Sequence, residues 1–297
     1  MYPTANRFNV PRLPTVVLQN LMENFNPIEF VRIDSTWTFK AYRKTREKEF
    51  DVQGSRCFGD AIVPVSFQDD YEIISFWEDP YSGLNTVYFH LSSLFNCPTD
   101  SIELYRTIPI DTSFSAIDYV SSRQSKIRIL TIAANPLTAE AVIRILSKIR
   151  SVEELNIYSE VTNVPEKFVI PFEAQSTRIF SASWITFDHL NSMRNCVSIE
   201  LWESNLTNED IQKFIDNWKQ GLYPNLQWLN VKSSKFTENF SINGLETLEV
   251  TINQKFVKRE MFNLEAIIHD AVQIHRNDGV IGLIRYYKGH NILHLLV

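Results

Sequence analysis

The chain has 297 residues, of which 44% are hydrophobic and 22% are charged, and its formal net charge is -6. It is long and apolar enough to fill one large core or two modest ones, which excludes a disordered chain. Acids outnumber bases and are mixed with them even in the densest basic run, so we expect no nucleic-acid partner and no anionic membrane partner.

The cysteines and the first residues bear on the compartment. Cys57, Cys97 and Cys196 are widely spaced and odd in number, which argues against a disulfide framework and a cysteine-rich zinc site. Residues 1–20 lack a basic start followed by an apolar core, and no segment approaches the ~20 apolar residues that span a bilayer. We therefore expect a reducing compartment, the cytoplasm or the nucleus, and no membrane partner.

Residues 8–49 are predicted to form two or three short helices. The prolines near residue 11 disfavour a helix, an apolar face follows over 16–22, a break falls at Asn26-Pro27, and a second helical stretch starts at Ile28. Helices this short cannot bury a core of their own. The segment is therefore expected either to cap the rest of the chain or to share its apolar face with a partner.

Residues 60–110 are predicted to form strands, which we expect at Ala61–Phe67, Tyr71–Trp77, Thr86–Leu91 and Ser101–Tyr105. Turn signals lie between them. Their dense aromatic residues are more typical of a packed sheet than of a ligand cage.

A strand-and-helix unit recurs from Ile127 onward. Ile127, Leu130 and Ile132 have the spacing L-x-x-L-x-L, a helix capped by Thr138 follows, and the phrase returns 25 residues later. The later copies are predicted to put these residues toward the core: Val152, Leu155, Ile157, Phe180, Ile199, Leu201, Leu229, Val231, Leu248 and Val250. This pattern predicts an irregular leucine-rich-repeat-like sheet with helices on one face, and the alternative is an ordinary open α/β sheet.

Two further elements complete the expected fold. Thr207 with Asp210 predicts a capped helix that carries an apolar stripe and stops near Gly221. Asp278-Gly279 between apolar runs predicts an antiparallel hairpin, and a last strand follows from Ile292 to Val297. The predicted fold class is α/β: a small helical start, then an open sheet with helices on one face, closed by a hairpin.

The face of this sheet that carries no helices is the predicted binding surface. Strand side chains alternate, so the residues beside the inward apolar positions share that face. The predicted target-binding residues are Tyr105, Tyr158, Glu200, Trp202, Trp228 and Asn230, with Glu103, Thr131, Asn156 and Glu249 on the same face. Rigid aromatics among acids are typical of an interaction hot spot for a basic peptide. The alternative is that the C-terminal hairpin or a loop covers the aromatics and makes them core.

The start of the chain resembles the F-box, the short helical motif that docks on the Skp adaptor of cullin-RING ubiquitin ligases. The resemblance lies in L-P-x-x-V-L-x-x-L-M followed by N-P-I-E-F-V, and Asp34 and Thr36 depart from the usual pattern. It implies that the adaptor-binding residues are Leu13, Pro14, Val17, Leu18, Leu21, Pro27, Ile28 and Val31.

Residues 100–297 resemble the F-box-associated domain of the large nematode F-box family. The resemblance lies in the segments around Ser121, Trp184, Asn205 and Trp218, and in the tail from Val272. It implies an F-box-like motif at 8–50, an associated domain at 60–297, and a substrate-recognition subunit of a Skp-cullin-F-box ubiquitin ligase with an unknown protein target. A binding scaffold without ligase docking is the alternative.

An enzyme is the third hypothesis for the function, because the usual catalytic signatures are missing. The sequence contains no glycine-rich phosphate loop, no H-E-x-x-H, no C-x-x-C and no G-x-S-x-G. The six histidines are scattered, and His290 and His294 flank a predicted strand too far apart to share a metal. We expect no catalytic residues, no metal and no cofactor.

Overall fold

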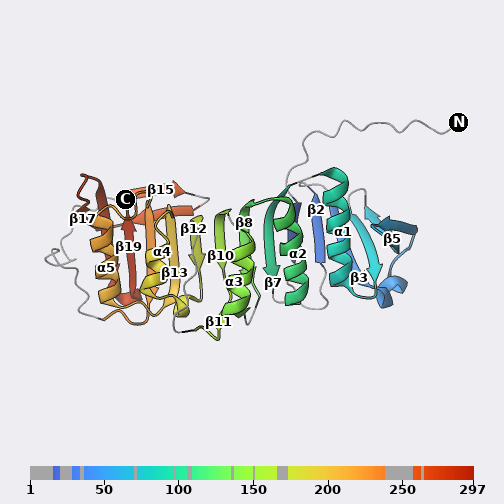
Figure 1. The fold of residues 1–297 in the computed structure, drawn as a ribbon, viewed down its shortest axis with the longest axis horizontal. Coiled ribbons are helices and arrows are strands. Elements are labelled where there is room, and N and C mark those ends of the chain that lie inside the picture. Colours follow the sequence, from blue (N-terminus) through green and yellow to red (C-terminus); the bar gives the residue numbers. More distant parts are fainter. Residues whose placement is uncertain are drawn as a thin grey trace. The chain divides into compact units, whose positions relative to one another are not determined.

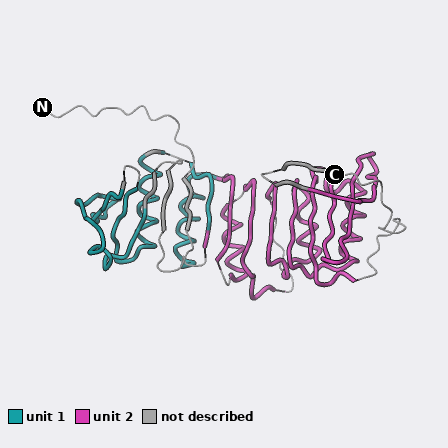
Figure 2. Tube along the Cα trace, turned by 180° about the vertical axis from the view of Figure 1, so that it is seen from behind, with its two compact units in different colours: residues 1–103, 107–124 teal, residues 104–106, 125–297 magenta. Residues whose placement is uncertain are grey.

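A computed structural model describes residues 16–20, 29–33, 37–69, 72–96, 98–105, 109–134, 137–149, 151–165, 173–237, 257–261 and 264–297. The chain forms two compact units (Figure 2). Unit 1 contains residues 1–103 and 107–124, and unit 2 contains residues 104–106 and 125–297. The predicted division into a motif at 8–50 and a domain at 60–297 stays a prediction.

Unit 1 is a mixed sheet with two helices. The sheet order is β7-β1-β2-β3-β6-β5-β4, in which β1–β7 and β3–β6 are parallel pairs and the other pairs are antiparallel. The strands are β1 (Val16–Asn20), β2 (Glu29–Ile33), β3 (Trp37–Arg43), β4 (Gly54–Phe58), β5 (Ala61–Asp69), β6 (Glu72–Trp77) and β7 (Thr99–Tyr105), and the last two residues of β7 belong to unit 2. The helices are α1 (Pro80–Phe95) and α2 (Ile110–Arg123), and a 3-10 turn, η1, spans Lys44–Glu49.

The helices expected across 8–49 are a wrong prediction where the structure describes this segment. It has strands β1, β2 and β3 there, and η1 after them. Short apolar runs suit both helix and strand periodicity, and β-branched residues such as Val16 and Val17 favour the strand. Pairing decides between them, since β1 lies between β2 and β7 and obtains ladder hydrogen bonds on both edges.

The strand expected at Thr86–Leu91 is also wrong, because these residues lie inside α1. Asp79 caps the helix by accepting from the backbone N–H groups of Tyr81 and Ser82, and Pro80 occupies the first turn. Leu84, Val87, Tyr88 and Leu91 then form a buried stripe at helical spacing. The strands expected at 61–67, 71–77 and 101–105 are confirmed as β5, β6 and β7.

Among the described residues of unit 2, eight strands lie side by side in the main sheet (Figure 1). Five successive parallel strands, β8, β10, β12, β13 and β14, are followed in the sheet by antiparallel β19, β18 and β17. Their bounds are β8 (Lys126–Ala133), β10 (Ser151–Ile157), β12 (Ala174–Ile179), β13 (Ser198–Ser204), β14 (Trp228–Ser233), β17 (Val272–His275), β18 (Ile281–Tyr287) and β19 (Ile292–Leu296). The predicted open α/β sheet, the Asp278-Gly279 hairpin and the last strand are confirmed.

The inward positions of the recurring phrase lie in register. Ile132, Ile157, Ile179, Leu201 and Val231 are neighbours across β8, β10, β12, β13 and β14. All five side chains are fully buried. The repeat spacing therefore reflects a continuous apolar row through the core of unit 2.

Three helices cover the side of the unit 2 sheet that faces the viewer in Figure 1. They are α3 (Ala139–Lys148), α4 (Phe187–Ser192) and α5 (Asn208–Lys219), with a 3-10 turn η2 (Ala182–Trp184) and a small sheet of β9 (Leu137–Thr138) and β11 (Val161–Thr162). The Thr138 hydroxyl oxygen accepts from the N–H of Ala141 at 3.2 Å, and Thr207 and Asp210 form a capping box. Both predicted caps are confirmed.

The C-terminal hairpin is fastened to α5 by Arg276. Its guanidinium donates to both carboxylate oxygens of Asp278, donates to the Tyr223 carbonyl at 3.4 Å, and lies 5.9 Å from the ring centroid of Trp218. A short 3-10 turn η3 (Lys288–His290) joins β18 to β19. A separate hairpin, β15 (Val257–Met261) with β16 (Leu264–Ile268), precedes these strands.

No helix among the described residues is both long and apolar enough to cross a membrane.

Candidate functional site

The side of the unit 2 sheet opposite α3, α4 and α5 carries a polar row. Register partners across neighbouring strands place six side chains side by side: Thr131, Asn156, Arg178, Glu200, Asn230 and His294. They alternate with the buried apolar positions, so they point away from the helices. Neighbouring strands are ~4.8 Å apart, so consecutive side chains of the polar row can touch.

The charges on this face are paired with one another. Arg178 Nε donates to Glu200 Oε1 at 3.4 Å, and Arg128 Nη1 lies 3.8 Å from Glu154 Oε1. The side chain of Glu200 is 10% exposed and that of Glu154 is 15% exposed. Both acids therefore sit in poorly solvated places next to a guanidinium, and neither offers an unbalanced negative charge to a partner.

Next to the polar row, three aromatic rings are stacked across successive parallel strands. Tyr158 follows β10, Phe180 follows β12, and Trp202 lies in β13. The ring centroids of Tyr158 and Phe180 are 4.4 Å apart with planes at 14°, and those of Phe180 and Trp202 are 6.3 Å apart with planes at 7°. We call these three residues the aromatic ladder. Tyr158 is 41% exposed, and Phe180 and Trp202 are half-buried.

Backbone hydrogen bonds hold the first two rungs in place. The N–H of Tyr158 donates to the carbonyl of Ile132 at 2.8 Å, and the N–H of Phe180 donates to the carbonyl of Ile157 at 2.9 Å. Each rung is thus tied to the neighbouring strand just beyond the regular ladder. This fixes the ring spacing before any partner arrives.

We expected all the predicted target-binding residues to be exposed, and this prediction is wrong for three of them. Trp228 and Asn230 are 5% exposed and Glu200 is 8% exposed. Trp228 packs in a cluster with Ile268 of β16, Ala271 and Leu296. The covering alternative therefore holds for Trp228, because a hairpin distant in the sequence folds over its end of the face.

The buried end of the face contains polar atoms without partners. Asn230 Oδ1, His294 Nδ1 and Trp202 Nε1 are buried and have no hydrogen-bond partner among the described residues. Burial lowers the pKa of His294 to about 4, so its imidazole is neutral at pH 7. Leaving such atoms buried without a partner costs free energy.

Sequence reasoning missed Arg178 and Phe180. It placed Phe180 among the inward positions, but Ile179 is the buried residue and is the register partner of Ile157 and Leu201. The alternation of Ser176, Arg178 and Phe180 around Thr177 and Ile179 was the available signal. A shift of one residue moves every side chain of a strand to the other face.

The remaining predicted site residues lie outside the polar row and the aromatic ladder. Tyr105 is half-buried at the end of β7. Val17 and Leu18 lie in β1, and Val31 lies in β2. The other predicted adaptor-binding residues and Glu249 lie outside the described residues: Leu13, Pro14, Leu21, Pro27 and Ile28.

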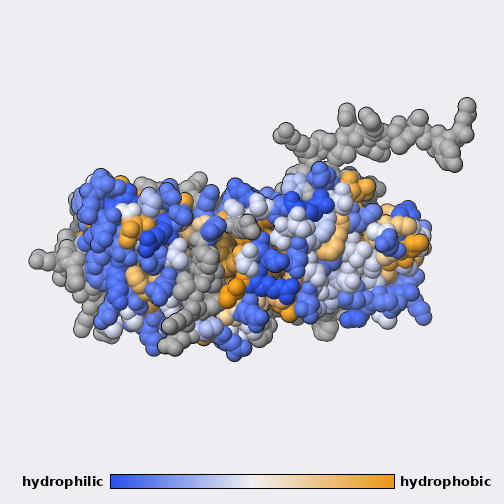
Figure 3. All heavy atoms as spheres, viewed as in Figure 1, coloured by the Kyte–Doolittle hydropathy of each residue, from blue (hydrophilic) through white to orange (hydrophobic). Residues whose placement is uncertain are grey.

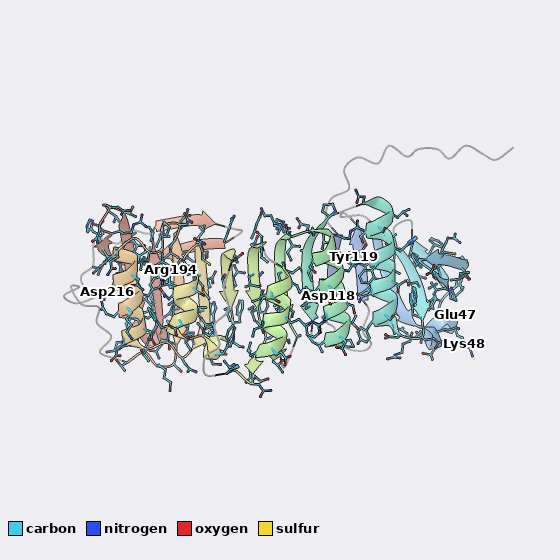
Figure 4. All side chains as sticks on the ribbon, in the orientation of Figure 1. Glu47, Lys48, Asp118, Tyr119, Arg194 and Asp216 are labelled. Atoms are coloured by element: carbon cyan, nitrogen blue, oxygen red, sulfur yellow. The ribbon has the colours of Figure 1, made fainter. Side chains whose placement is uncertain are left out.

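The helix side of unit 2 has both hydrophilic and apolar surface. In Figure 3 hydrophilic atoms dominate over α5 and an apolar patch lies over α3. Arg194 and Asp216, labelled in Figure 4, are held locally, since Arg194 donates to the carbonyl of Asn191 and Asp216 accepts from Gln212. Within the described ranges, no three His, Cys, Asp or Glu side chains come together as a metal site requires.

Comparison with known proteins places a family match on these strands. Residues 164–231 match the family model described as F-box associated. That range contains β12, β13 and the first part of β14. It therefore includes two rungs of the aromatic ladder and the Arg178–Glu200 pair.

A curated relative is similar to part of the chain. The Skn-1 dependent zygotic transcript 15 protein of Caenorhabditis elegans is 27% identical over 199 residues, which cover 64% of this chain and 56% of the relative. The chain thus spans about half the length of that relative. No solved structure matches the chain. The similarity to the F-box-associated family therefore lies in residues 164–231.

Proposed function

We propose that the chain recruits a protein target to a Skp-cullin-F-box ubiquitin ligase, in the cytoplasm or the nucleus. The observation that carries the proposal is the F-box-associated match over 164–231, whose strands bear most of the aromatic ladder. In this role the chain catalyses nothing. It raises the effective concentration of a target lysine beside a charged ubiquitin-conjugating enzyme.

The target-binding surface in this proposal is the sheet face opposite α3, α4 and α5. Tyr158 and Trp202 contact the target in this proposal, because Tyr158 is 41% exposed and Trp202 is only half-buried. The buried Glu200, Asn230 and Trp228 support them from within the face, and Tyr105 extends the surface. Half-buried rigid aromatics bury much area at little entropic cost, which suits a recognition surface.

Docking on the Skp adaptor is proposed to use the N-terminal segment that resembles the F-box. The test is co-purification of the full chain with a recombinant Skp adaptor. Leu18→Asp with Leu21→Asp is expected to abolish adaptor binding, since burying a Leu is worth roughly 1.5–3 kcal/mol and a buried carboxylate costs more. Ile143→Asp on α3, where the apolar side chain is 45% exposed, is the matched control and should bind as the wild type does.

A second function is favoured by a specific observation. Strands β1, β2 and β3 occupy a segment in which the F-box resemblance implies helices. A non-catalytic binding scaffold without ligase docking accommodates those strands. Failure of the wild-type chain to bind the adaptor would replace the ligase proposal with this one, and the target-binding surface would remain.

A further inference from the structure

Tyr158 forms one end of the aromatic ladder. Phe180 stacks on one face of the Tyr158 ring. In the sheet, β10 has β12 on one side and β8 on the other, so the second face of the ring is turned toward β8. The 41% exposure of Tyr158 is consistent with an open ring face on that side.

The neighbouring strand carries a small side chain at the next position of this row. The register pairs Ile132 with Ile157, and one further step places Ala133 beside Tyr158. Ala133 is half-buried and follows Thr131 on the same face of the sheet. A methyl group therefore stands where the next strands carry Tyr158, Phe180 and Trp202.

The charges around this position restrict what can fill it. Arg128 lies 3.8 Å from Glu154, and Arg178 donates to Glu200 at 3.4 Å. Glu154 and Glu200 are therefore each already paired with a guanidinium. A basic side chain gains little here, which revises the expectation of a basic target peptide, and an acidic side chain gains little for the same reason.

We propose that the space over Ala133 beside Tyr158 receives an aromatic side chain of the target, which stacks on Tyr158 as the fourth rung of the aromatic ladder. This inference rests on the proposed target-binding role of the same face. Offset-stacked rings gain ~0.5–1.5 kcal/mol beyond the area that they bury. The preformed stack holds Tyr158 at the required angle, so little order is lost on binding.

The test uses the full chain labelled with carbon-13 at its alanine methyl groups. Acetylated peptides Gly-Gly-X-Gly-Gly, with X as Trp, Leu or Arg, are titrated while the Ala133 methyl resonance is followed. The tryptophan peptide is expected to move this resonance upfield through its ring current. The leucine and arginine peptides should bind roughly tenfold more weakly and leave the resonance in place.

Two variants test the proposed stacking position, one by removing the Tyr158 ring and one by filling the position beside it. Tyr158→Ala removes the stacking partner, and Ala133→Leu fills the space while keeping the ring. Both should abolish binding of the tryptophan peptide in ligand-observed saturation-transfer spectra. Ile281→Ala, at a side chain that is 48% exposed on β18, is the control and should bind normally.

The proposal is overturned if no peptide binds, if the arginine or leucine peptide binds as well as the tryptophan peptide, or if Tyr158→Ala leaves binding intact. Thermal unfolding of each variant separates lost folding from lost binding. These outcomes do not depend on the Skp adaptor, so failure of this inference is distinguishable from failure of ligase docking.

Discussion

Gly282 of β18 packs directly against the indole of Trp218 on α5. A Cβ built on Gly282 would lie 2.9 Å from Trp218 Cη2 and 3.0 Å from Leu295 Cδ1. Trp218 is completely buried, so its ring has nowhere to move. This close approach joins the C-terminal hairpin to the helix layer of unit 2.

Gly282→Ala is therefore expected to destabilise the protein by roughly 1–3 kcal/mol, because the added methyl overpacks a rigid contact. Denaturant unfolding followed by fluorescence measures the change. Gly289→Ala is the matched control, since a Cβ there meets nothing within 4 Å. Equal stability of the Gly282 variant and the control would contradict the close contact.

Stability should fall as the pH is lowered from 6.5 toward 4, because of two histidines. Burial lowers the pKa of His189 and of His294 from 6.5 to about 4. The unfolded chain then binds protons that the folded chain refuses, so stability is lost as the pH falls through this window. His189 also accepts from the backbone N–H of Thr186 through Nδ1, and protonation removes that bond.

The effect is expected to be on the order of 1–2 kcal/mol for each histidine. Urea unfolding at a series of pH values measures it. His189→Asn should reduce the slope between pH 4 and 6.5, even if the variant is less stable overall. His275→Asn, at an exposed site on β17, is the control and should leave the slope as it is in the wild type.

The Arg178–Glu200 pair should show strong coupling. Glu200→Leu leaves a guanidinium that is only 20% exposed without its acceptor, and we expect a loss of roughly 1–3 kcal/mol. Arg178→Met combined with Glu200→Leu should recover most of that loss, because no charge remains in the face. A double-mutant cycle of unfolding free energies gives the coupling, and additive losses would argue against the contact.

Variants at Trp228 and Tyr158 should distinguish an effect on protein stability from an effect on target binding. Trp228→Ala is expected to cost roughly 3–5 kcal/mol, since the ring packs against Ile268 and Leu296. Tyr158→Ala removes a side chain that is 41% exposed and should change the unfolding free energy much less. Thermal unfolding with peptide binding measures both. Normal target capture by a folded Trp228→Ala variant would remove this residue from the binding surface.

The local elements with strong caps and a full apolar stripe were predictable. Helices α3 and α5 follow from Thr138 and Thr207, each of which begins a run of buried residues at helical spacing. Cap and stripe lie within a dozen residues, so no distant contact is needed to choose the structure. The same holds for the hairpin at Asp278-Gly279, whose turn residues suit a positive φ.

Where the signal was a short apolar run, the sequence left helix and strand equally open. Residues 16–20 became β1 because β2 and β7 pair with its two edges, and residues 86–91 became helix because Asp79 and Pro80 begin α1 just before them. Pairing partners far along the chain carry no local signal.

The composition and the spacing of Ile127, Leu130 and Ile132 by themselves determined that the second part of the chain is an open sheet with helices on one side, since the same apolar period returns in each unit. Only the tertiary structure decided which residues form the candidate site. Phe180 reached the face through a register that differs by one residue from the expected one, and Trp228 left the surface because Ile268 of a later hairpin packs on it. Register and coverage are set by contacts between distant segments, and a periodic pattern within one strand does not contain them.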